Sequence, residues 1–374
     1  MSNKIKTFII AGGGTGGHIY PGVAVARSLK QQDPHCQVIF VGTALGLETK
    51  IIPREGFELK LIEVGKLNHG GGAIGKLKTL LQLPFAFLQS YKILKYYSPQ
   101  AVLGVGGYAS GPLVLTASFM GIRTAIWEAN SHPGMTNRWL SRFVDESYLV
   151  FSEAQRLLKA KVVRVMGLPV RAEIENPLPE TTSSDFRILI VGGSQGSRAI
   201  NTCVSDAIVK GGDWLEGVKF IHQAGVHDIE ALRKKYVGFE SRVEVHDFLY
   251  DMNVRYANCD LVICRGGAST VAELAAGGKV SIVIPLPTAA DNHQQKNAET
   301  LLKHQAGTML LQADMTPESL VEAIQNLRNN PELRRQISAN IRRLFMPNSA
   351  QNMAHALSAA EPLRSNSSLK DLEP

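Results

Sequence analysis

The chain has 374 residues, 44% of them hydrophobic and 20% charged, with a mean hydropathy of −0.02. This ordinary globular composition excludes disordered, collagen-like and coiled-coil proteins, and the length favours two domains that each bury a core. The net charge of +7 suits a phosphorylated substrate or an anionic membrane surface. The basic residues are scattered along the chain rather than clustered, so we expect no nucleic-acid partner.

The cysteines and the N-terminus indicate a cytoplasmic protein. The four cysteines form no Cys-x-x-Cys pair and show no zinc spacing, which is typical of reduced, packed thiols inside the cell. The apolar run Phe8–Ala11 is too short for a signal peptide. No stretch reaches the roughly 18 apolar residues of a membrane span, so we expect a soluble or peripheral protein.

Short apolar runs alternate with segments of helical periodicity along the whole chain. The runs predicted as buried strands are Thr7–Ala11, Gln37–Val41, Ala101–Gly104, Thr124–Ile126, Arg187–Val191, Val218–His222, Leu261–Cys264 and Val280–Ile284. Between them, apolar residues recur at helical spacing, as at Ile200, Val204 and Ile208. This alternation predicts an α/β fold with doubly wound parallel sheets covered on both faces.

The strongest boundary signal is the stretch from Gly167 to Asp185, which contains three prolines and has no periodicity. The second half then repeats the order of elements in the first half, in which a strand is followed by a glycine-rich turn and a helix. We therefore predict two similar Rossmann-like domains. The last residues, 363–374, have the composition of a disordered tail.

The first glycine-rich turn, Gly12–Gly17, fits the pattern G-x-G-x-x-G between a strand and a helix. Glycines there allow backbone N–H groups to approach a phosphate at the helix N-terminus. A dinucleotide enzyme also needs an acidic residue after its second strand to bind the ribose, whereas that strand ends in Val41-Gly42-Thr43. An NAD(P) oxidoreductase is therefore disfavoured, and a tight turn without a ligand is the structural alternative.

The second turn, Gly192–Gly196, fits both a phosphate-binding turn and the G-x-S-x-G nucleophile elbow of hydrolases. Ser194 would then be the nucleophile of a serine hydrolase, followed by Asp291 and by His293 or His304. No oxyanion-type His-Gly motif precedes the turn, and the first turn would have no role. A phosphate contact by Ser194 is the favoured interpretation.

The third turn leads from Arg265 into a helix that contains Glu273. The backbone donors and dipole of such a helix N-terminus suit a diphosphate, and Glu273 could accept both hydroxyls of a ribose. Its alternative role is only to complement the helix dipole. The chain has neither H-E-x-x-H nor an Asp-x-Asp pair, so we expect no metal and no cofactor.

The segment from Gly72 to Leu88 resembles a basic amphipathic helix that lies at a membrane surface. An ordinary helix packed on the sheet would have the same pattern. The residues predicted to contact the membrane are Lys76, Lys78, Leu80, Leu81, Phe85 and Phe87.

Several motifs in one order resemble the bacterial MurG family of N-acetylglucosaminyltransferases, which convert lipid I to lipid II in peptidoglycan synthesis. The motifs are Gly13–His18, Gly104–Pro112, Gly192–Gly196, Cys264–Glu273 and Gln294-Gln295, and the resemblance covers residues 7 to 360. It implies the B-type glycosyltransferase fold, with two Rossmann-like domains facing a cleft. The implied domains are residues 1–167 with 346–362 for the acceptor and the membrane, and residues 168–345 for the donor.

The resemblance also implies the substrates and their contacts. The donor is UDP-GlcNAc, the acceptor is lipid I, and the enzyme is peripheral on the cytoplasmic face of the inner membrane. In the donor domain, Ser194, Ala268, Ser269 and Thr270 would contact the phosphates, Glu273 the ribose, Gln294 and Gln295 the sugar, and Arg171 and the backbone at Leu249 the uracil. In the acceptor domain, Thr15, Gly16 and Gly17 would bind the diphosphate, with His18 and Tyr108 close to the reacting atoms. Glu128 and Asn130 match a His-Glu-Gln-Asn run of the family, as a catalytic and a substrate-binding residue.

The chemistry implied is attack of an acceptor hydroxyl on the anomeric carbon, with inversion. His18 is the expected general base because imidazole titrates near neutral pH, and Glu128 is the second choice. The chain departs from the family pattern at Trp127, Leu168 and Gly267, where the family has His, Asn and Ser. An oxidoreductase, a serine hydrolase and a binding protein without catalysis are the competing classes.

Overall fold

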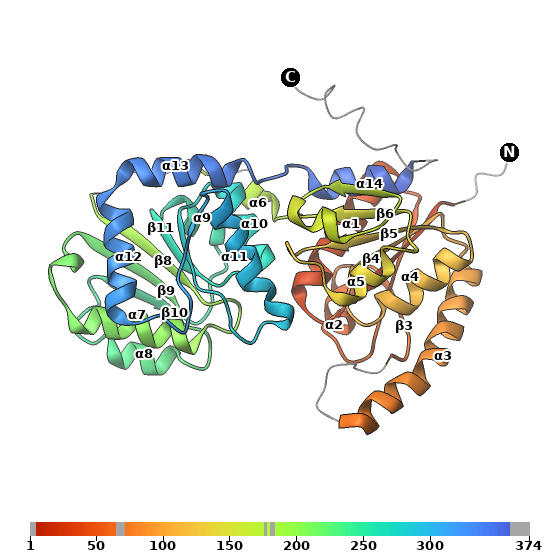
Figure 1. Cartoon of the computed structure of the whole chain (residues 1–374), viewed down its shortest axis with the longest axis horizontal. Coiled ribbons are helices and arrows are strands. Elements are labelled where there is room, and N and C mark those ends of the chain that lie inside the picture. The colour runs from red at the N-terminus through yellow and green to blue at the C-terminus, as the bar shows by residue number, and fades with distance from the viewer. Residues whose placement is uncertain (1–4, 65–71, 176–177, 180–183, 360–374) are drawn as a thin grey trace, which may run out of the picture. The chain divides into compact units, whose positions relative to one another are not determined.

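The computed structural model describes residues 5–64, 72–175, 178–179 and 184–359, with the side chains of 72–82 and 172 also outside the description. The chain forms two compact units (Figure 1). Unit 1 comprises the residues up to Pro169 and those from Asn348 on, and unit 2 comprises Val170–Pro347. The tail expected at 363–374 lies outside the described residues.

Unit 1 is built on a seven-stranded sheet in which every pairing is parallel. In sheet order its strands are β3 (Glu58–Leu61), β2 (Gln37–Gly42), β1 (Thr7–Gly12), β4 (Ala101–Gly106), β5 (Arg123–Glu128), β6 (Glu146–Leu149) and β7 (Val162–Val165). Its helices are α1 (Gly16–Gln32), α2 (Glu48–Arg54), α3 (Gly72–Tyr97), α4 (Ser110–Phe119), α5 (Met135–Leu140), the 3-10 helix η1 (Ser152–Leu157) and α14 (Ser349–Ser358).

Unit 2 is built on a six-stranded sheet that is also parallel throughout. In sheet order its strands are β10 (Val243–His246), β9 (Val218–Gln223), β8 (Phe186–Val191), β11 (Leu261–Cys264), β12 (Ser281–Val283) and β13 (Thr308–Met309). Its helices are α6 (Ala172–Glu175), α7 (Arg198–Lys210), η2 (Asp213–Leu215), α8 (Ile229–Lys235), α9 (Met252–Ala257), α10 (Ala268–Gly277), η3 (Ala290–Asn292), α11 (His293–Lys303), α12 (Pro317–Asn329) and α13 (Pro331–Arg342).

The central strands are buried on both faces because helices cover each side of each sheet. All six residues of β1 are buried, and so are all four residues of β11. A strand without a solvent-exposed face needs no polar alternation, which is why these segments read as continuous apolar runs in the sequence. In unit 2, one core joins β8, β9, β11 and β12 to the apolar faces of α7, α8 and α12.

The predicted fold class is confirmed, and each predicted strand is present. Five strands, β3, β6, β7, β10 and β13, were not predicted from the sequence. Four of these, β3, β7, β10 and β13, are the edge strands of the two sheets. An edge strand is covered on fewer sides, and the side chains of β7 and β13 are only partly buried. Such strands therefore lack the continuous apolar run that marks a central strand.

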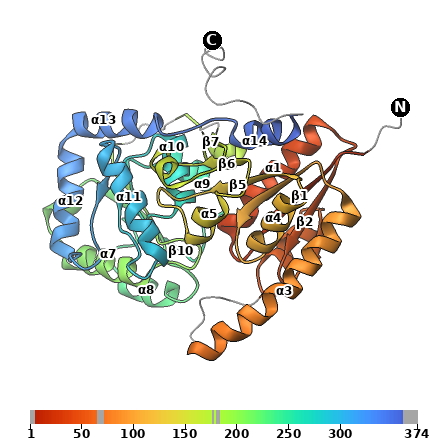
Figure 2. The same cartoon turned by 45° about the vertical axis from the view of Figure 1, so that its right-hand side comes forward.

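The last helix, α14, packs against α1 of unit 1, as both views show (Figures 1 and 2). Two glutamine side chains fix its backbone: Gln32 Nε2 donates to the carbonyl of Gln351 at 3.4 Å, and Gln100 Nε2 donates to that of Ser358 at 3.3 Å. Helix α14 is thus an integral part of unit 1.

A buried carboxylate connects this helix end to the sheet. Glu146 of β6 has no exposed side-chain surface, and it accepts hydrogen bonds from the guanidinium of Arg123 on β5, with Nε at 3.0 Å. Arg164 of β7 lies 3.8 Å from its second oxygen. Arg123 Nη1 also donates to the carbonyl of Ala359 at 2.5 Å, so one ion cluster joins three strands to the end of α14.

Replacing Glu146 by Ala should therefore destabilise unit 1 strongly. The change leaves the Arg123 guanidinium buried without its carboxylate, and we expect a loss of about 3 kcal/mol in the free energy of unfolding. Urea unfolding followed by circular dichroism measures this loss. The control is Glu332→Ala, which removes an exposed pair with Arg335 and should leave the curve unchanged. Identical curves for both variants would contradict the prediction.

Candidate active site

The topology places all the predicted glycine turns at the switch points of the two sheets. In unit 1 the strand order changes direction between β1 and β4, and in unit 2 between β8 and β11. At such a point the loops from adjacent parallel strands run to opposite faces and leave a crevice at the carboxyl edge, where open α/β sheets bind their ligands. Each unit therefore carries one candidate binding site at this edge.

In unit 1 the turns after β1 and β4 touch backbone to backbone. The amide of Gly13 donates to the carbonyl of Gly106 at 3.2 Å. A Cβ on Gly12 would lie 2.4 Å from Val105 Cγ2, and one on Gly107 would lie 2.6 Å from the carbonyl oxygen of Gly13. Gly107 also has a φ of +84°, which disfavours any other residue. These glycines are required by the close contact of the two turns.

Helix α1 begins directly after the first turn. Thr15 is its N-cap and makes no side-chain capping bond, and Gly16 and Gly17 form the start of the first turn of the helix. Thr15 and Gly17 are exposed. Because the first amides of a helix have no acceptor within it and carry partial positive charge, this end of α1 presents donors suited to an anion.

His18 and Tyr108 lie at the same edge of the sheet. The imidazole of His18 packs against Gly106, because a Cβ built there would lie 3.0 Å from His18 Cδ2 and 3.1 Å from Nε2. His18 and Tyr108 are both partly exposed. The structure thus places His18, in the first turn of α1, against the turn after β4 that also carries Tyr108.

Glu128 holds a loop rather than facing solvent. Its side chain, at the end of β5, is 4% exposed and accepts hydrogen bonds from the backbone of Asn130 at 2.9 Å and of Gly134 at 3.2 Å. The side-chain amides of Asn130 and Asn137 donate to the same carboxylate as well, at 3.2 and 2.9 Å. Burial raises the pKa of Glu128 although these donors act in the opposite direction. A carboxylate so surrounded fixes the position of Asn130.

Two of the three departures from the family pattern, Trp127 and Leu168, are buried side chains, and the third is Gly267. Trp127 is 1% exposed and its Nε1 donates to the carbonyl of Gly167 at 3.3 Å, so this side chain belongs to the core of unit 1. Leu168 is also buried. Gly267 is the N-cap of α10, and nothing in the structure explains the absence of a serine there.

In unit 2 the turn after β8 is fixed by the loop that follows β9. A Cβ on Gly196 would lie 2.0 Å from the carbonyl oxygen of Ala224, and one on Gly225 would lie 2.1 Å from that of Gln195. The side chain of Gln223 donates to the carbonyl of Gly193 at 2.9 Å. The turn therefore has a defined conformation that its own sequence alone would not impose.

Ser194 lies exposed at the tip of this turn. Among the described residues, no hydrogen bond joins its hydroxyl to a histidine, and His293 instead pairs with the carbonyl of Ala290 at 2.8 Å. The arrangement that a serine hydrolase needs is thus missing from the described part of the chain. The geometry suits a hydroxyl or amide contact to a bound phosphate.

Arg265, at the end of β11, is the side chain that joins the loops of unit 2. It is 8% exposed and donates to the carbonyls of Ile284 and Pro285, both at 3.1 Å. It also donates to Ser197 Oγ at 2.6 Å and to Gln312 Oε1 at 2.8 Å. Burial lowers the pKa of Arg265, yet a guanidinium stays charged at neutral pH. No carboxylate pairs with it among the residues described.

The role of Arg265 was not predicted from the sequence. An arginine directly after an apolar strand is a signal for such a buried cation, because it must find acceptors among the neighbouring loops. Its charge lies between the N-termini of α7 and α10, which adds to their positive potential.

The turn after β11 leads into α10 with Ala268 buried and Ser269 and Thr270 partly exposed. The start of α11 packs on this turn, since Asn297 donates to the carbonyl of Gly266 at 3.1 Å. Gln294 Oε1 accepts the amide of Leu286 at 3.0 Å. Gln295 instead donates to Glu299 of its own helix at 2.9 Å.

Glu273 lies one turn further along α10, with Arg171 beside it. Its carboxylate accepts a hydrogen bond from the Tyr256 hydroxyl at 3.1 Å and pairs with Arg171 Nη2 at 3.4 Å. Burial raises the pKa of Glu273, and the positive charge of Arg171 partly offsets this effect. The structure thus joins two residues that the sequence analysis assigned to the ribose and the uracil.

Leu249 follows β10 in a loop. Its side chain is 3% exposed, whereas those of its neighbours Phe248 and Tyr250 are 39% and 85% exposed. The two aromatic rings contact each other edge to face, with centroids 4.8 Å apart. The buried leucine anchors the loop and holds its backbone in place.

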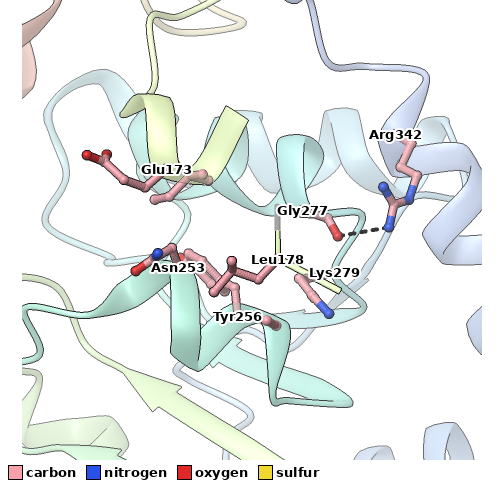
Figure 3. A pocket seen from close by; sticks show the side chains of 9 residues that line it. Glu173, Leu178, Asn253, Tyr256, Gly277, Lys279 and Arg342 are labelled. Atoms are coloured by element: carbon pink, nitrogen blue, oxygen red, sulfur yellow. Dashed lines mark hydrogen bonds between the residues drawn. The ribbon is translucent and has the colours of Figure 1, made fainter. Parts of the chain in front are cut away.

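A small pocket in unit 2 lies at the other end of α10 (Figure 3). Arg342 Nη2 donates to the carbonyl of Gly277 at 3.2 Å, and Lys279 Nζ lies 3.5 Å from the carbonyl of Cys259. Both cations thus lie near the C-terminal end of the helix, where positive charge is stabilising. Tyr256 is part of the pocket wall and connects it to Glu273.

The described residues contain neither a metal-ligand cluster nor a membrane-spanning helix. No group of three or more His, Cys, Asp and Glu side chains there could hold a metal ion. No helix within the described ranges is long and apolar enough to span a membrane.

The comparisons with known proteins agree with this geometry. The N-terminal domain model of glycosyltransferase family 28 matches residues 8–149, and the C-terminal domain model matches residues 187–355. A relative from Bdellovibrio bacteriovorus is 52% identical over 93% of this chain and 98% of its own. One from Anaeromyxobacter sp. (strain K) is 44% identical over 92% and 91%. Both carry the name UDP-N-acetylglucosamine–N-acetylmuramyl-(pentapeptide) pyrophosphoryl-undecaprenol N-acetylglucosamine transferase.

Among solved structures, MurG from Acinetobacter baumannii superposes with a TM-score of 0.79 at 30% identity, covering 94% of this chain and 99% of that one. Two parallel α/β units with glycine turns at their switch points define a B-type glycosyltransferase. More specifically, the chain belongs to glycosyltransferase family 28. The resemblance seen in the sequence motifs is thereby confirmed, and the oxidoreductase and hydrolase classes are set aside.

A buried polar network supports the turn after β8 in unit 2, and its members are not apparent from the sequence. His222 of β9 is fully buried, with Nδ1 2.9 Å from the Tyr236 hydroxyl and Nε2 3.0 Å from Asn201 Oδ1. Asn201 of α7 in turn donates to the carbonyl of Ala224 at 2.8 Å and to Asp228 at 2.9 Å. The network therefore holds the loop against which the turn packs.

This network should make the stability of the protein depend on pH. Burial lowers the pKa of His222 to about 3, whereas an exposed imidazole titrates near about 6.5. The unfolded chain therefore binds a proton at this residue between those values and the folded chain does not, so stability falls as the pH falls through this window.

The variant His222→Phe removes that linkage. It should be less stable than the wild type at pH 7, because it loses two hydrogen bonds, but the difference should shrink by up to about 1.4 kcal/mol for each pH unit below pH 6.5. Urea unfolding at a series of pH values measures it. A difference that does not change with pH would contradict the burial of a neutral imidazole.

Proposed function

We propose that this enzyme transfers GlcNAc from UDP-GlcNAc to the C4 hydroxyl of the MurNAc residue of lipid I, which yields lipid II for peptidoglycan synthesis. The observation that carries the proposal is the 52% identity, over 93% of the chain, to a relative named as the transferase for this step. The three glycine turns at the switch points support it, because both substrates are diphosphates.

The donor diphosphate would bind in unit 2, between the turn that carries Ser194 and the first turn of α10 at Ala268–Thr270. Helix N-termini supply donors in fixed positions there, and the buried guanidinium of Arg265 adds a full positive charge. The departing UDP gains negative charge during transfer. Fixed donors stabilise that charge without reorganising, so no metal ion is needed in this scheme.

Glu273 would accept the ribose hydroxyls, with Arg171 holding its carboxylate from the other side. The backbone at Leu249 would read the uracil edge, because the buried side chain fixes that loop. Gln294 has its amide nitrogen available for the sugar, since its oxygen already accepts the amide of Leu286. Gln295 would have to leave Glu299 to reach the sugar.

The acceptor diphosphate would bind in unit 1 at Thr15, Gly16 and Gly17. The C4 hydroxyl oxygen then attacks the anomeric carbon from the face opposite UDP, the bond to the phosphate oxygen breaks, and the configuration inverts. The hydroxyl proton passes to His18. Among the described residues His18 suits this role better than Glu128, because it is partly exposed at the turn, whereas Glu128 is occupied by donors. Tyr108 lies on the adjacent turn and would orient the acceptor.

The acceptor is anchored in a bilayer, so we place the enzyme on the cytoplasmic face of the inner membrane. Figures 1 and 2 show that the N-terminal half of α3 extends beyond the other elements of unit 1. Phe85 is 64% exposed, whereas Phe87 is partly buried and packs against the core of unit 1. The side chains of Lys76, Lys78, Leu80 and Leu81 lie outside the description.

The variant Glu273→Ala tests the donor site. Loss of hydrogen bonds to a charged group should weaken binding of UDP-GlcNAc by about 1.5 to 3 kcal/mol, measured by calorimetry, and should reduce transfer of labelled GlcNAc to lipid I. Glu322→Ala, a change on the exposed side of α12, is the matched control. Unchanged affinity in Glu273→Ala would exclude the ribose role.

The double variant Lys76→Glu with Lys78→Glu tests membrane docking. Each basic residue near an anionic surface contributes about 1 kcal/mol, so binding to vesicles with anionic lipid should weaken, and it should weaken in the wild type as salt rises. Activity on lipid I in vesicles should fall, while activity on a short-chain, water-soluble acceptor should persist. Equal losses on both acceptors would show that this segment is ordinary protein core.

A further inference from the structure

A buried carboxylate lies against the turn after β1 in unit 1, where the acceptor diphosphate is proposed to bind. Glu48 is the first residue of α2 and is 1% exposed. Its Oε2 accepts the amide of Gly14 at 2.8 Å, and its Oε1 accepts the amide of Thr43 at 2.9 Å and the Thr43 hydroxyl at 3.0 Å. One side chain thus joins the turn after β1 to the end of β2.

The surrounding backbone is shaped around this carboxylate. A Cβ on Gly13 would lie 2.2 Å from Glu48 Oε1, and one on Gly42 would lie 2.6 Å from Glu48 Cγ. The carbonyl of Gly14 accepts the amide of Leu47 at 3.2 Å. The peptide unit of Gly14 is therefore held from both sides by the loop that begins α2.

Gly14 needs such support because it has a φ of +91° and a Cβ there would meet nothing within 4 Å. No packing contact limits this residue from that side, and glycine has more backbone freedom than any other residue. The hydrogen bonds from Glu48 and to Leu47 take the place of packing. They set the direction in which the chain enters α1 and hence the direction of its first amides.

The position of Glu48 is informative by comparison with dinucleotide enzymes. In those proteins an acidic residue after the second strand faces outward and binds the ribose. Here the carboxylate comes a few residues later, faces inward and binds the amide of the chain's own turn. In unit 1 this carboxylate therefore supports the chain's own turn after β1.

We propose that Glu48 is a positioning residue of the acceptor site, which fixes Gly14 so that the amides from Thr15 to Gly17 point at the acceptor diphosphate. This inference rests on the acceptor site proposed above. A negative charge near an anion site opposes binding by simple Coulomb repulsion. The positioning role thus predicts a sign opposite to the electrostatic one when the charge is removed.

The variant Glu48→Gln separates the two effects. Glutamine keeps the size but has only one acceptor oxygen, so either Gly14 or Thr43 loses its partner. We expect the KM for a short-chain lipid I analogue to rise by about tenfold, the equivalent of one hydrogen bond to a charged group. The KM for UDP-GlcNAc, which binds unit 2, should stay as in the wild type. An acceptor KM that is unchanged or lower would overturn the proposal.

A control and a second variant keep the test decisive. Glu55→Gln alters an acidic residue at the other end of α2, which pairs with Arg27 at the surface, and should leave both KM values unchanged. If Glu48→Gln does not fold, Thr43→Val removes one donor to the same carboxylate. It should raise the acceptor KM in the same direction by a smaller factor, and no change in that KM would also overturn the proposal.

Hydrogen exchange distinguishes a failure of this inference from a failure of the proposed function. In Glu48→Gln the amides of residues 12–17 should exchange faster than in the wild type, with no change in the peptides of unit 2. If the wild-type enzyme shows no transfer activity, the proposed function is refuted, but the exchange of residues 12–17 still tests whether Glu48 holds the turn. Unchanged exchange in residues 12–17 would refute the brace itself.

Discussion

Contact between backbone and backbone, with no room for a side chain, is the constraint on which both halves of the molecule depend. In unit 1 the turns after β1 and β4 meet at Gly12, Gly13 and Gly107, and in unit 2 the turns after β8 and β9 meet at Gly196 and Gly225. These contacts hold the strand ends close together, and the residues at the start of α1 and α7 remain exposed or partly exposed. The glycines are needed there because a Cβ on Gly107 or Gly196 would overlap the backbone of the neighbouring turn.

Such turns need support from behind, and each unit supplies it with buried polar side chains. In unit 1 the support is a carboxylate, Glu48, which accepts backbone donors. In unit 2 it is a cation, Arg265, together with the neutral pair of His222 and Asn201. The charge of each supporting side chain matches the groups it binds. In unit 1 the turns present backbone amides, which donate to a carboxylate. In unit 2 the loops present carbonyls and a hydroxyl, which accept from a guanidinium.

The sequence was sufficient for the centre of each sheet and for the turns at its edge. Both follow from local patterns: a doubly covered strand such as β1 is an apolar run, and a close backbone contact such as that at Gly12 demands glycine. It was insufficient for edge strands such as β7, whose half-covered side chains carry no clear pattern. It also missed Glu48 and Arg265, because their partners lie on other loops and only the folded chain brings them together.

The return of α14 to unit 1 has a consequence for biosynthesis. Helix α1 precedes the whole of unit 2 in the chain, but the helix that covers it, α14, follows the whole of unit 2. Domains usually fold in the order in which they are synthesised. Here unit 1 stays incomplete, with the surface of α1 that α14 covers still open, until α14 has been synthesised after the whole of unit 2. A chain that stops within unit 2 would therefore leave that surface of α1 exposed.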